Sequence, residues 1–305
     1  MKSGGSPSRP ILLTIAGFDP SSGAGIAADL KVFAAHRMYG ISAITALTVQ
    51  STQGVRRTEP VSPDLLKETL QCLVEDMQID GVKIGMLGTA ANVRVVSRFL
   101  ENSGLPPGRI VLDPVIRSSS GKELLDPSGL DLLRTELLAR AGWVTPNIQE
   151  LAILLERPVS GTSEIPRAAA DLQSQHAALR SRLDPPAAPD SGLERPPNSH
   201  SGLKEPRSGL NIVVTGGESD PPNDFLRSAA GDEFWFPGER IETSATHGTG
   251  CTFSSALLSA LVAGESPAEA VKAAKNYVAL AMRKAYRIGK GNGPLHHLFD
   301  QEVSR

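Results

Sequence analysis

Short apolar runs alternate with amphipathic stretches along most of the chain. The runs are rich in β-branched residues and end at Gly, Pro or polar residues, which is typical of strands buried on both faces of a sheet. They predict strands over residues 11–16, 41–49, 81–85, 109–115, 143–145, 211–215 and 234–241. The stretches between them have helical spacing and predict helices over residues 26–36, 63–77, 90–100, 130–140, 146–154 and 267–288, with one more inside 246–264.

This alternation predicts one α/β domain over residues 11–300, with a mostly parallel central sheet flanked by helices on both faces. Residues 1–10 are polar and are predicted to be a disordered tail. Residues 181–209 interrupt the domain, because they are rich in Pro and Ser and repeat the triplet Ser-Gly-Leu. Such a segment cannot form a core, so we expect a disordered insertion. A linker between two domains is the alternative, but too few strands follow it.

The composition excludes several classes of partner. The 31 basic and 33 acidic residues leave a net charge of −2, which argues against binding to nucleic acid or to an anionic membrane. The uncharged stretch 243–264 begins with too many polar residues to span a bilayer. Only two cysteines occur, Cys72 and Cys251, so no disulfide framework is expected. A reducing, cytoplasmic location fits this composition best.

The most informative stretch begins at Thr246 and contains Gly248, Thr249, Gly250 and Cys251. Its glycines allow the backbone to turn tightly and to approach a ligand, and the residues after them continue as a helix. The unpaired amides of a first helical turn, together with the helix dipole, bind anions such as phosphate. The same field is expected to lower the pKa of the Cys251 thiol. Alone, the stretch also fits a closely packed helix in which Cys251 is a small buried residue.

Seven motifs, in one order, resemble the hydroxymethylpyrimidine and phosphomethylpyrimidine kinases of the ribokinase-like superfamily. They are T-I-A-G-F-D-P-S-S-G-A-G-I-A-A-D-L-K from Thr14, I-T-A-L-T-V-Q from Ile44, K-I-G-M-L from Lys83, V-L-D-P-V from Val111, T-P-N-I-Q-E from Thr145, T-H-G-T-G-C from Thr246 and G-P-L-H-H from Gly293. The resemblance implies a three-layer α/β/α fold. It also implies ATP-dependent phosphorylation of 4-amino-5-hydroxymethyl-2-methylpyrimidine, and then of its monophosphate, in thiamine diphosphate biosynthesis. Members are commonly homodimers.

By this resemblance, five residues line the pyrimidine pocket: Gly17, Asp29, Thr48, Gln50 and Met86. Gln50 would form paired hydrogen bonds with the aminopyrimidine edge, because an amide offers a donor beside an acceptor. Without the resemblance, Gln50 would be interpreted as a solvent-facing strand end, Asp29 as a charge on a helix surface and Met86 as core filling.

On the nucleotide side, the resemblance implies that Asn147 and Glu150 organise Mg²⁺ and the triphosphate, with Asp113 helping through the metal's water shell. Thr215 and Gly217 would contact ATP, although many family members have Lys at the position of Thr215. Standing alone, Asn147 and Glu150 fit an ordinary helix start equally well.

The first-turn amides of Gly248, Thr249 and Gly250 would hold the transferring phosphoryl group. Cys251 would be the base that accepts the hydroxyl proton, or would mainly shape the pocket. His296 and His297 match the family's tail, but adjacent histidines diverge, so no metal is assigned to them.

Two other functions fit parts of the pattern. A pyridoxal or pyridoxine kinase is a close relative, although Cys251 and Gln50 favour the pyrimidine. A non-catalytic, pyrimidine-binding regulator on the same fold is suggested by Thr215, whereas Asn147, Glu150 and the paired glycines argue against it.

Overall fold

The computed structural model describes residues 9–118, 121–183, 209–217 and 219–301. These residues form one nine-stranded sheet with the order β3-β2-β1-β4-β5-β6-β7-β8-β9. The strands are β1 (Ile11–Phe18), β2 (Tyr39–Ser51), β3 (Gly54–Pro60), β4 (Gly81–Ile84), β5 (Ile110–Leu112), β6 (Trp143–Val144), β7 (Asn211–Val214), β8 (Asp224–Arg227) and β9 (Glu233–Phe236). The strands from β2 to β7 in this order are parallel, and β3, β8 and β9 are antiparallel at the two edges.

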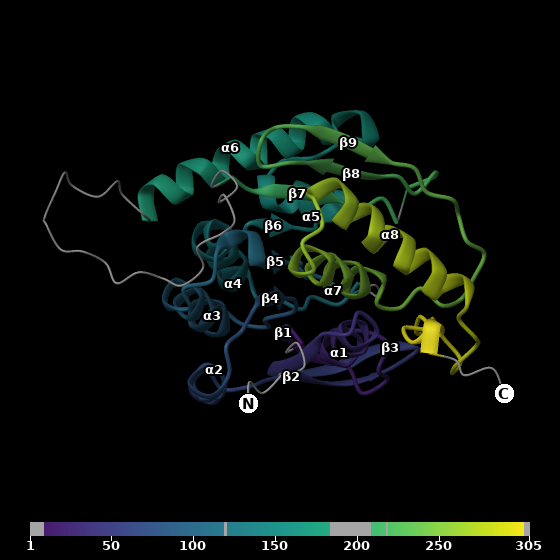
Figure 1. The fold of residues 1–305 in the computed structure, drawn as a ribbon, viewed down its shortest axis with the longest axis horizontal. Helices are drawn as coiled ribbons and strands as arrows, with labels where there is room; N and C mark the ends of the chain where they lie inside the picture. Colours follow the sequence, from purple (N-terminus) through teal and green to yellow (C-terminus); the bar gives the residue numbers. More distant parts are fainter. Residues whose placement is uncertain (1–8, 119–120, 184–208, 218, 302–305) are drawn as a thin grey trace, which may run out of the picture.

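Helices cover both faces of the sheet (Figure 1). They are α1 (Gly25–Ala35), α2 (Pro63–Asp76), α3 (Ala90–Asn102), α4 (Pro127–Leu132), α5 (Ile148–Leu155), α6 (Ile165–Leu183), α7 (Thr249–Val262) and α8 (Pro267–Arg283). One core lies between the sheet and α2 to α6, and a second lies between the sheet and α1, α7 and α8. The predicted three-layer, mostly parallel α/β fold is therefore confirmed.

Alternation along the central strands separates these two cores. In β1, Leu12 belongs to the core under α7 whereas Leu13 belongs to the core under α2 and α3. In β5, Val111 and Leu112 are divided in the same way. Successive side chains of a strand point to opposite faces, so a strand covered on both sides must be apolar at every position. This requirement produces the continuous apolar runs of the sequence.

Three elements are absent from the sequence-based prediction. Strand β3 carries exposed Arg56 and Arg57 at an edge of the sheet, so it has no apolar run. Strand β8 has only four residues, which is too short to show a periodicity. Helix α6 buries only two large apolar residues, Ile165 and Leu172, beside Ala168, Ala169 and His176, and this gives a weak apolar signal.

Several predicted boundaries were wrong. The strand predicted over residues 234–241 is the short edge strand β9, and the last long helix ends at Arg283 rather than at residue 288. The helix predicted over residues 130–140 is α4 followed by a π turn, Leu133–Leu137, and a 3-10 turn, Leu138–Arg140. Among the described residues, no helix is long and apolar enough to cross a bilayer.

The predicted first residue of the insertion, residue 181, is too early in the chain. Helix α6 continues to Leu183, so the first three residues of the range 181–209 are helical. At the other end, Gly209 is described and Leu210 is fully buried before β7 begins. Residues 184–208 of the predicted insertion and residues 1–8 of the predicted tail lie outside the described residues.

Candidate functional site

A cavity of about 720 Å³ lies where the carboxyl ends of β1, β2, β5 and β6 meet the starts of α5 and α7. The site residues proposed from the sequence line this cavity, with one exception: Gly17, Thr48, Gln50, Met86, Asp113, Asn147, Glu150, Thr215, Gly217, Gly248, Thr249, Gly250 and Cys251. Carboxyl ends of parallel strands are the usual place for a ligand in an open α/β sheet. The topology thus brings together residues that are far apart in the sequence.

The start of α7 has its backbone open to the cavity. Gly248 is the N-cap residue with φ +86°, and a Cβ there would lie 1.9 Å from Gly23 O, so only glycine fits. Glycine also has no side chain that could accept hydrogen bonds from the first-turn amides. Gly250, in that turn, is exposed. The geometry therefore suits an anion at this helix start.

The thiol of Cys251 does not have the properties that the sequence suggests. Burial raises the pKa of Cys251 to about 12, and the carboxylates of Asp113 and Asp29 act in the same direction. Lys83 and a hydrogen bond from the backbone of Gly25 oppose this shift without compensating for it. The raised pKa contradicts the prediction of a thiolate, because removal from water and the nearby carboxylates favour the neutral thiol.

Asp29 is the exception to the predicted pocket lining. Its side chain is fully buried, and its carboxylate lies 3.0 Å from Lys83 Nζ. It also accepts hydrogen bonds from Thr14 Oγ1 at 2.6 Å and from Ser255 Oγ at 2.8 Å. Asp29 thus lies behind the cavity wall, where it joins β1, β4 and α7. The prediction that it lines the pyrimidine pocket is wrong, because the helix turns this charge inward to a lysine.

Lys83 and Asp113 extend this buried group of charges to the cavity. Burial is the largest single effect and disfavours the ammonium group, but the negative charges around it, chiefly that of Asp29, together outweigh burial and raise the pKa of Lys83 above its ordinary value. Asp113 Oδ2 lies 3.9 Å from Lys83 Nζ and accepts a hydrogen bond from Ser254 Oγ at 3.1 Å. Burial raises the pKa of Asp113, although Lys83 opposes the shift. Sequence reasoning found Asp113 and gave Lys83 no role.

The start of α5 differs from the start of α7, because it is capped by its own side chains. Asn147 Oδ1 accepts a hydrogen bond from Glu150 N at 2.8 Å, and Glu150 Oε2 accepts one from Asn147 N at 2.9 Å. This is a complete capping box. Both residues still line the cavity. Asn147 is the N-cap rather than a residue within the helix, and the two hydrogen bonds of the capping box hold it to Glu150.

One residue that lines the cavity beside α5 has a buried hydroxyl. Thr145 Oγ1 has no hydrogen-bond partner within the described part of the chain, although Thr145 is only 4% exposed. Thr145 lines the cavity at the end of β6. Buried polar atoms normally have a partner, so this hydroxyl is suited to a bound polar ligand. Sequence reasoning quoted Thr145 within a motif but did not recognise it as a site residue.

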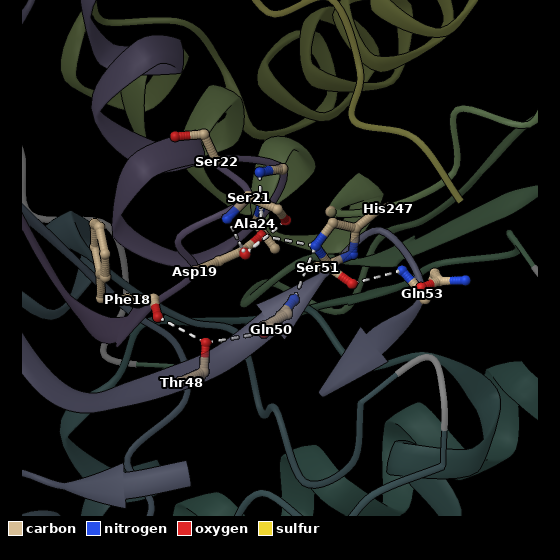
Figure 2. A network of polar contacts seen from close by, with 12 residues as sticks. Phe18, Asp19, Ser21, Ser22, Ala24, Thr48, Gln50, Ser51, Gln53 and His247 are labelled. Carbon is tan, nitrogen blue, oxygen red and sulfur yellow. Dashed lines mark hydrogen bonds and ion pairs between the residues drawn. The ribbon is translucent and has the colours of Figure 1, made fainter. Parts of the chain in front are cut away.

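At the carboxyl end of β2, Figure 2 shows the amide of Gln50 between the Thr48 hydroxyl and the His247 imidazole. Thr48 Oγ1 lies 3.2 Å from Gln50 Oε1, and His247 Nε2 lies 3.0 Å from Gln50 Nε2. His247 Nε2 also lies 2.7 Å from Asp19 Oδ2. Sequence reasoning missed Asp19 and His247. The run Asp-Pro-Ser-Ser-Gly was the available signal for Asp19, since Asp at such a turn accepts hydrogen bonds from the following amides.

The C-terminal tail packs against the other side of α7. His297 Nε2 lies 3.0 Å from Thr252 Oγ1, and the Thr252 hydroxyl donates to Gly248 O at 2.8 Å. The hydroxyl has one hydrogen, so His297 is the donor in their contact. Burial lowers the pKa of His297 to about 4. His297 is therefore a neutral residue that supports the start of α7.

The sequence of this chain is similar to those of known kinases. The chain matches a family model described as phosphomethylpyrimidine kinase over residues 19–179 and 199–296. A hydroxymethylpyrimidine/phosphomethylpyrimidine kinase of Haemophilus influenzae is 35% identical over 291 residues, which cover 94% of this chain and 96% of that protein. The break in the family match overlaps the Pro- and Ser-rich segment.

Solved structures of kinases have the same fold as this chain. A Staphylococcus aureus pyridoxal kinase in complex with ADP has a TM-score of 0.78 and 26% identity, covering 97% of this chain and 96% of that one. A phosphomethylpyrimidine kinase of Clostridium difficile 630 has a TM-score of 0.69 and 29% identity, covering 90% and 99%. The ribokinase-like fold expected from the motifs is thus confirmed.

The high pKa of Cys251 predicts slow alkylation. With a pKa of about 12, only about one thiol in ten thousand is ionised at pH 8, and only the thiolate reacts. We expect iodoacetamide to modify Cys251 on the order of a thousandfold more slowly than an ordinary exposed thiol. Mass spectrometry of the Cys72→Ser variant would isolate this reaction. Modification at the rate of a free cysteine would contradict the high pKa.

The neutral state of His297 predicts a loss of stability in acid. Its folded-state pKa of about 4 lies below the ordinary value of 6.5, so the unfolded chain binds more protons between these two values. The contribution of His297 to the free energy of unfolding is fully present above pH 6.5. It falls as the pH decreases towards 4, by about 3 kcal/mol at most. Denaturant unfolding at several pH values should show a smaller slope for His297→Gln than for the wild type. Equal slopes would contradict the assignment.

Proposed function

Because the chain belongs to the phosphomethylpyrimidine kinase family, we propose that it transfers the γ-phosphoryl group of ATP to 4-amino-5-hydroxymethyl-2-methylpyrimidine and then to the resulting monophosphate. These steps would prepare the pyrimidine half of thiamine diphosphate. One observation carries the proposal: the amide of Gln50 and the uncapped start of α7 open into the same cavity. An alcohol on a ring bound by Gln50 can therefore meet a phosphoryl group bound by backbone amides.

The phosphoryl group would be held by the first-turn amides at Gly248, Thr249 and Gly250. The helix dipole alone contributes only about 0.3 to 1 kcal/mol at an exposed end, so the hydrogen bonds must do most of the binding. Donors that are already oriented need no reorganisation as charge develops on the transferring group. Phosphoryl transfer depends mainly on such positioning and on charge neutralisation.

The residues at the ends of β5 and β6 fit Mg²⁺ bound together with the nucleotide. Asp113 and Glu150 offer carboxylate oxygens, and Thr145 offers the buried hydroxyl without a partner. No group of three or more His, Cys, Asp or Glu in the described residues forms a metal cage. Mg²⁺ usually keeps several waters and binds through one or two carboxylates and the substrate phosphates. When bound, it would neutralise charge on the phosphates.

Cys251 has a smaller role in this proposal than the sequence implies. A thiol with a pKa of about 12 is a poor proton acceptor at neutral pH. The second acceptor, a phosphate monoester, is mostly ionised at pH 7 and brings little proton to remove. The loose transition state of phosphoryl transfer gains little from a base. We therefore assign Cys251 to the wall of the site beside the acceptor oxygen.

The nucleotide would extend from the start of α7 towards Thr215 and Gly217. Thr215 N donates to Pro146 O at 2.9 Å, so its backbone is held beside α5. A cation on this side of the cavity comes from α8, where Lys275 Nζ lies 2.9 Å from Asp224 Oδ2. Pyridoxal phosphorylation is the second candidate, because the pyridoxal kinase of S. aureus has a similar fold. A homodimer and a cytoplasmic location are further proposals taken from the family resemblance.

A substrate comparison tests the proposal directly. We expect coupled ATP-turnover assays to give a higher kcat/KM for hydroxymethylpyrimidine and its monophosphate than for pyridoxal. The expected margin is at least about tenfold, because Gln50 matches the aminopyrimidine edge. A higher kcat/KM for pyridoxal would overturn the substrate assignment. Binding of the pyrimidine without any turnover would favour the regulatory protein.

The glycines of α7 provide a matched pair of variants. An ideal Cβ at Gly250 has Asp113 Oδ2 at 4.0 Å as its nearest neighbour, so Gly250→Ala should fold and be as stable as the wild type. Its methyl group would occupy the proposed phosphate site and lower kcat at least about tenfold. Gly248→Ala should instead reduce stability, because the new Cβ meets Gly23 O. Full activity of Gly250→Ala would exclude phosphate from this helix start.

A further inference from the structure

The amide of Gln50 contacts two protein groups, the Thr48 hydroxyl and the His247 imidazole (Figure 2). We propose that His247 is a positioning residue which, together with Thr48, fixes which end of the Gln50 amide carries the carbonyl oxygen. It thereby selects the order of donor and acceptor on the ring edge that the site binds. The inference rests on the proposed function, in which Gln50 contacts the pyrimidine.

The carboxylate of Asp19 is held in place by the turn that follows it. Asp19 Oδ1 accepts hydrogen bonds from Ser21 N at 2.8 Å and Ser21 Oγ at 2.7 Å. Asp19 Oδ2 accepts them from Gly23 N at 3.1 Å and Ala24 N at 3.0 Å. Burial opposes ionisation, but the hydrogen bonds from His247 and Ser21 outweigh it and lower the pKa of Asp19 to about 2. At neutral pH, Asp19 is therefore a carboxylate that can only accept hydrogen bonds.

This carboxylate determines the hydrogen on the imidazole. His247 Nε2 lies 2.7 Å from Asp19 Oδ2, so this nitrogen must carry a hydrogen and donate it. A ring nitrogen that carries a hydrogen has no lone pair left to accept another. The group of Gln50 that faces His247 must therefore be an acceptor, which shares the Nε2 hydrogen with Asp19 Oδ2 in a three-centre hydrogen bond. Gln50 Nε2 lies there at 3.0 Å, which places two donors together, and a half-turn of the amide replaces it with the carbonyl oxygen.

The other end of the amide leads to the same orientation. The Thr48 hydroxyl donates its single hydrogen to Phe18 O at 2.9 Å, so towards Gln50 it can only accept. Gln50 Oε1 lies 3.2 Å from this hydroxyl oxygen, which places two acceptors together. The same half-turn brings an N–H of the amide to Thr48. One rotation therefore satisfies both contacts.

The hydrogen-bonding groups that remain define the ligand. A primary amide has two N–H groups and two carbonyl lone pairs, and the protein uses one of each. Gln50 then presents one donor beside one acceptor to the cavity. This pair matches a ring edge with an amine next to an unprotonated nitrogen. A ring edge with a carbonyl next to an N–H would bind poorly, because a donor would then face a donor and an acceptor would face an acceptor.

The imidazole of His247 is held in place by segments from both ends of the chain. A Cβ at Gly23 would lie 2.4 Å from His247 Cδ2, so the ring occupies space that this glycine leaves open. His247 N donates to Gly293 O at 3.1 Å in the C-terminal tail. The ring cannot move away from Gln50 without displacing one of these segments. His247 thus has the rigid support that a positioning residue needs.

The test compares two substrates in three proteins. The substrates are the aminopyrimidine and 5-hydroxymethyl-2-methylpyrimidin-4-one, whose ring edge has the reversed order of donor and acceptor. We expect the wild type to prefer the aminopyrimidine by at least about 100-fold in kcat/KM. In His247→Leu the amide can turn, so this ratio should fall about tenfold. In His247→Gln an N–H near the position of Nε2 should preserve the ratio within about threefold.

The ratio separates positioning from general support of the site. An unchanged ratio in a folded His247→Leu protein would overturn the inference, even if both substrates reacted more slowly. If the wild type turns over neither pyrimidine, the proposed function fails.

A measurement on the wild type tests the inference without variants or turnover. Long-range ¹H–¹⁵N NMR spectra report which imidazole nitrogen carries the hydrogen. We expect the hydrogen of His247 on Nε2, both free and with the aminopyrimidine bound. A His247 whose hydrogen is on Nδ1 alone would overturn the inference, because the Gln50 amide would then face an acceptor.

Discussion

The site depends on one contact between backbones that are distant in the sequence. The turn after β1 meets the start of α7 so closely that a Cβ at Gly248 would lie 1.9 Å from Gly23 O. The hydrogen bond between Asp19 and His247 joins the same two segments across 228 positions. This contact brings the cavity lining from β1 and β2, which includes Gln50, against the start of α7. A larger residue at Gly248 would separate the two halves of the proposed reaction.

The buried charges behind the cavity wall keep these segments in register. Asp29 on α1 contacts Thr14 on β1, Lys83 on β4 and Ser255 on α7, so one carboxylate is bonded to three elements. Removing one partner of a buried ion pair typically costs about 3 to 5 kcal/mol, because the other charge remains buried. The same burial raises the pKa of Cys251 at the cavity surface. Support of the fold and the chemistry of the thiol therefore have a common origin.

The local sequence pattern was sufficient to predict those features that depend on residues close together in the chain. The double-faced burial of β1 and β5 and the glycine turn before α7 are visible in the sequence, and so are the residues at the carboxyl ends of strands. The contact of Asp19 with His247 was not, because it joins segments 228 positions apart. The direction of Asp29 and the pKa of Cys251 depend on burial by several elements, which a motif does not report. Strand β3 was missed because an exposed edge strand needs no apolar run.

The two helix starts at the cavity differ in how their first-turn amides are satisfied. Helix α5 satisfies its first amides with Asn147 and Glu150, so an anion there would compete with a side chain already in place. Helix α7 begins at Gly248, which offers no such side chain. A negatively charged group should therefore bind at α7, while the carboxylates near α5 repel it and attract a cation. In the proposed function, this difference between two neighbouring helices would orient a metal-bound nucleotide with its terminal phosphate towards Gln50.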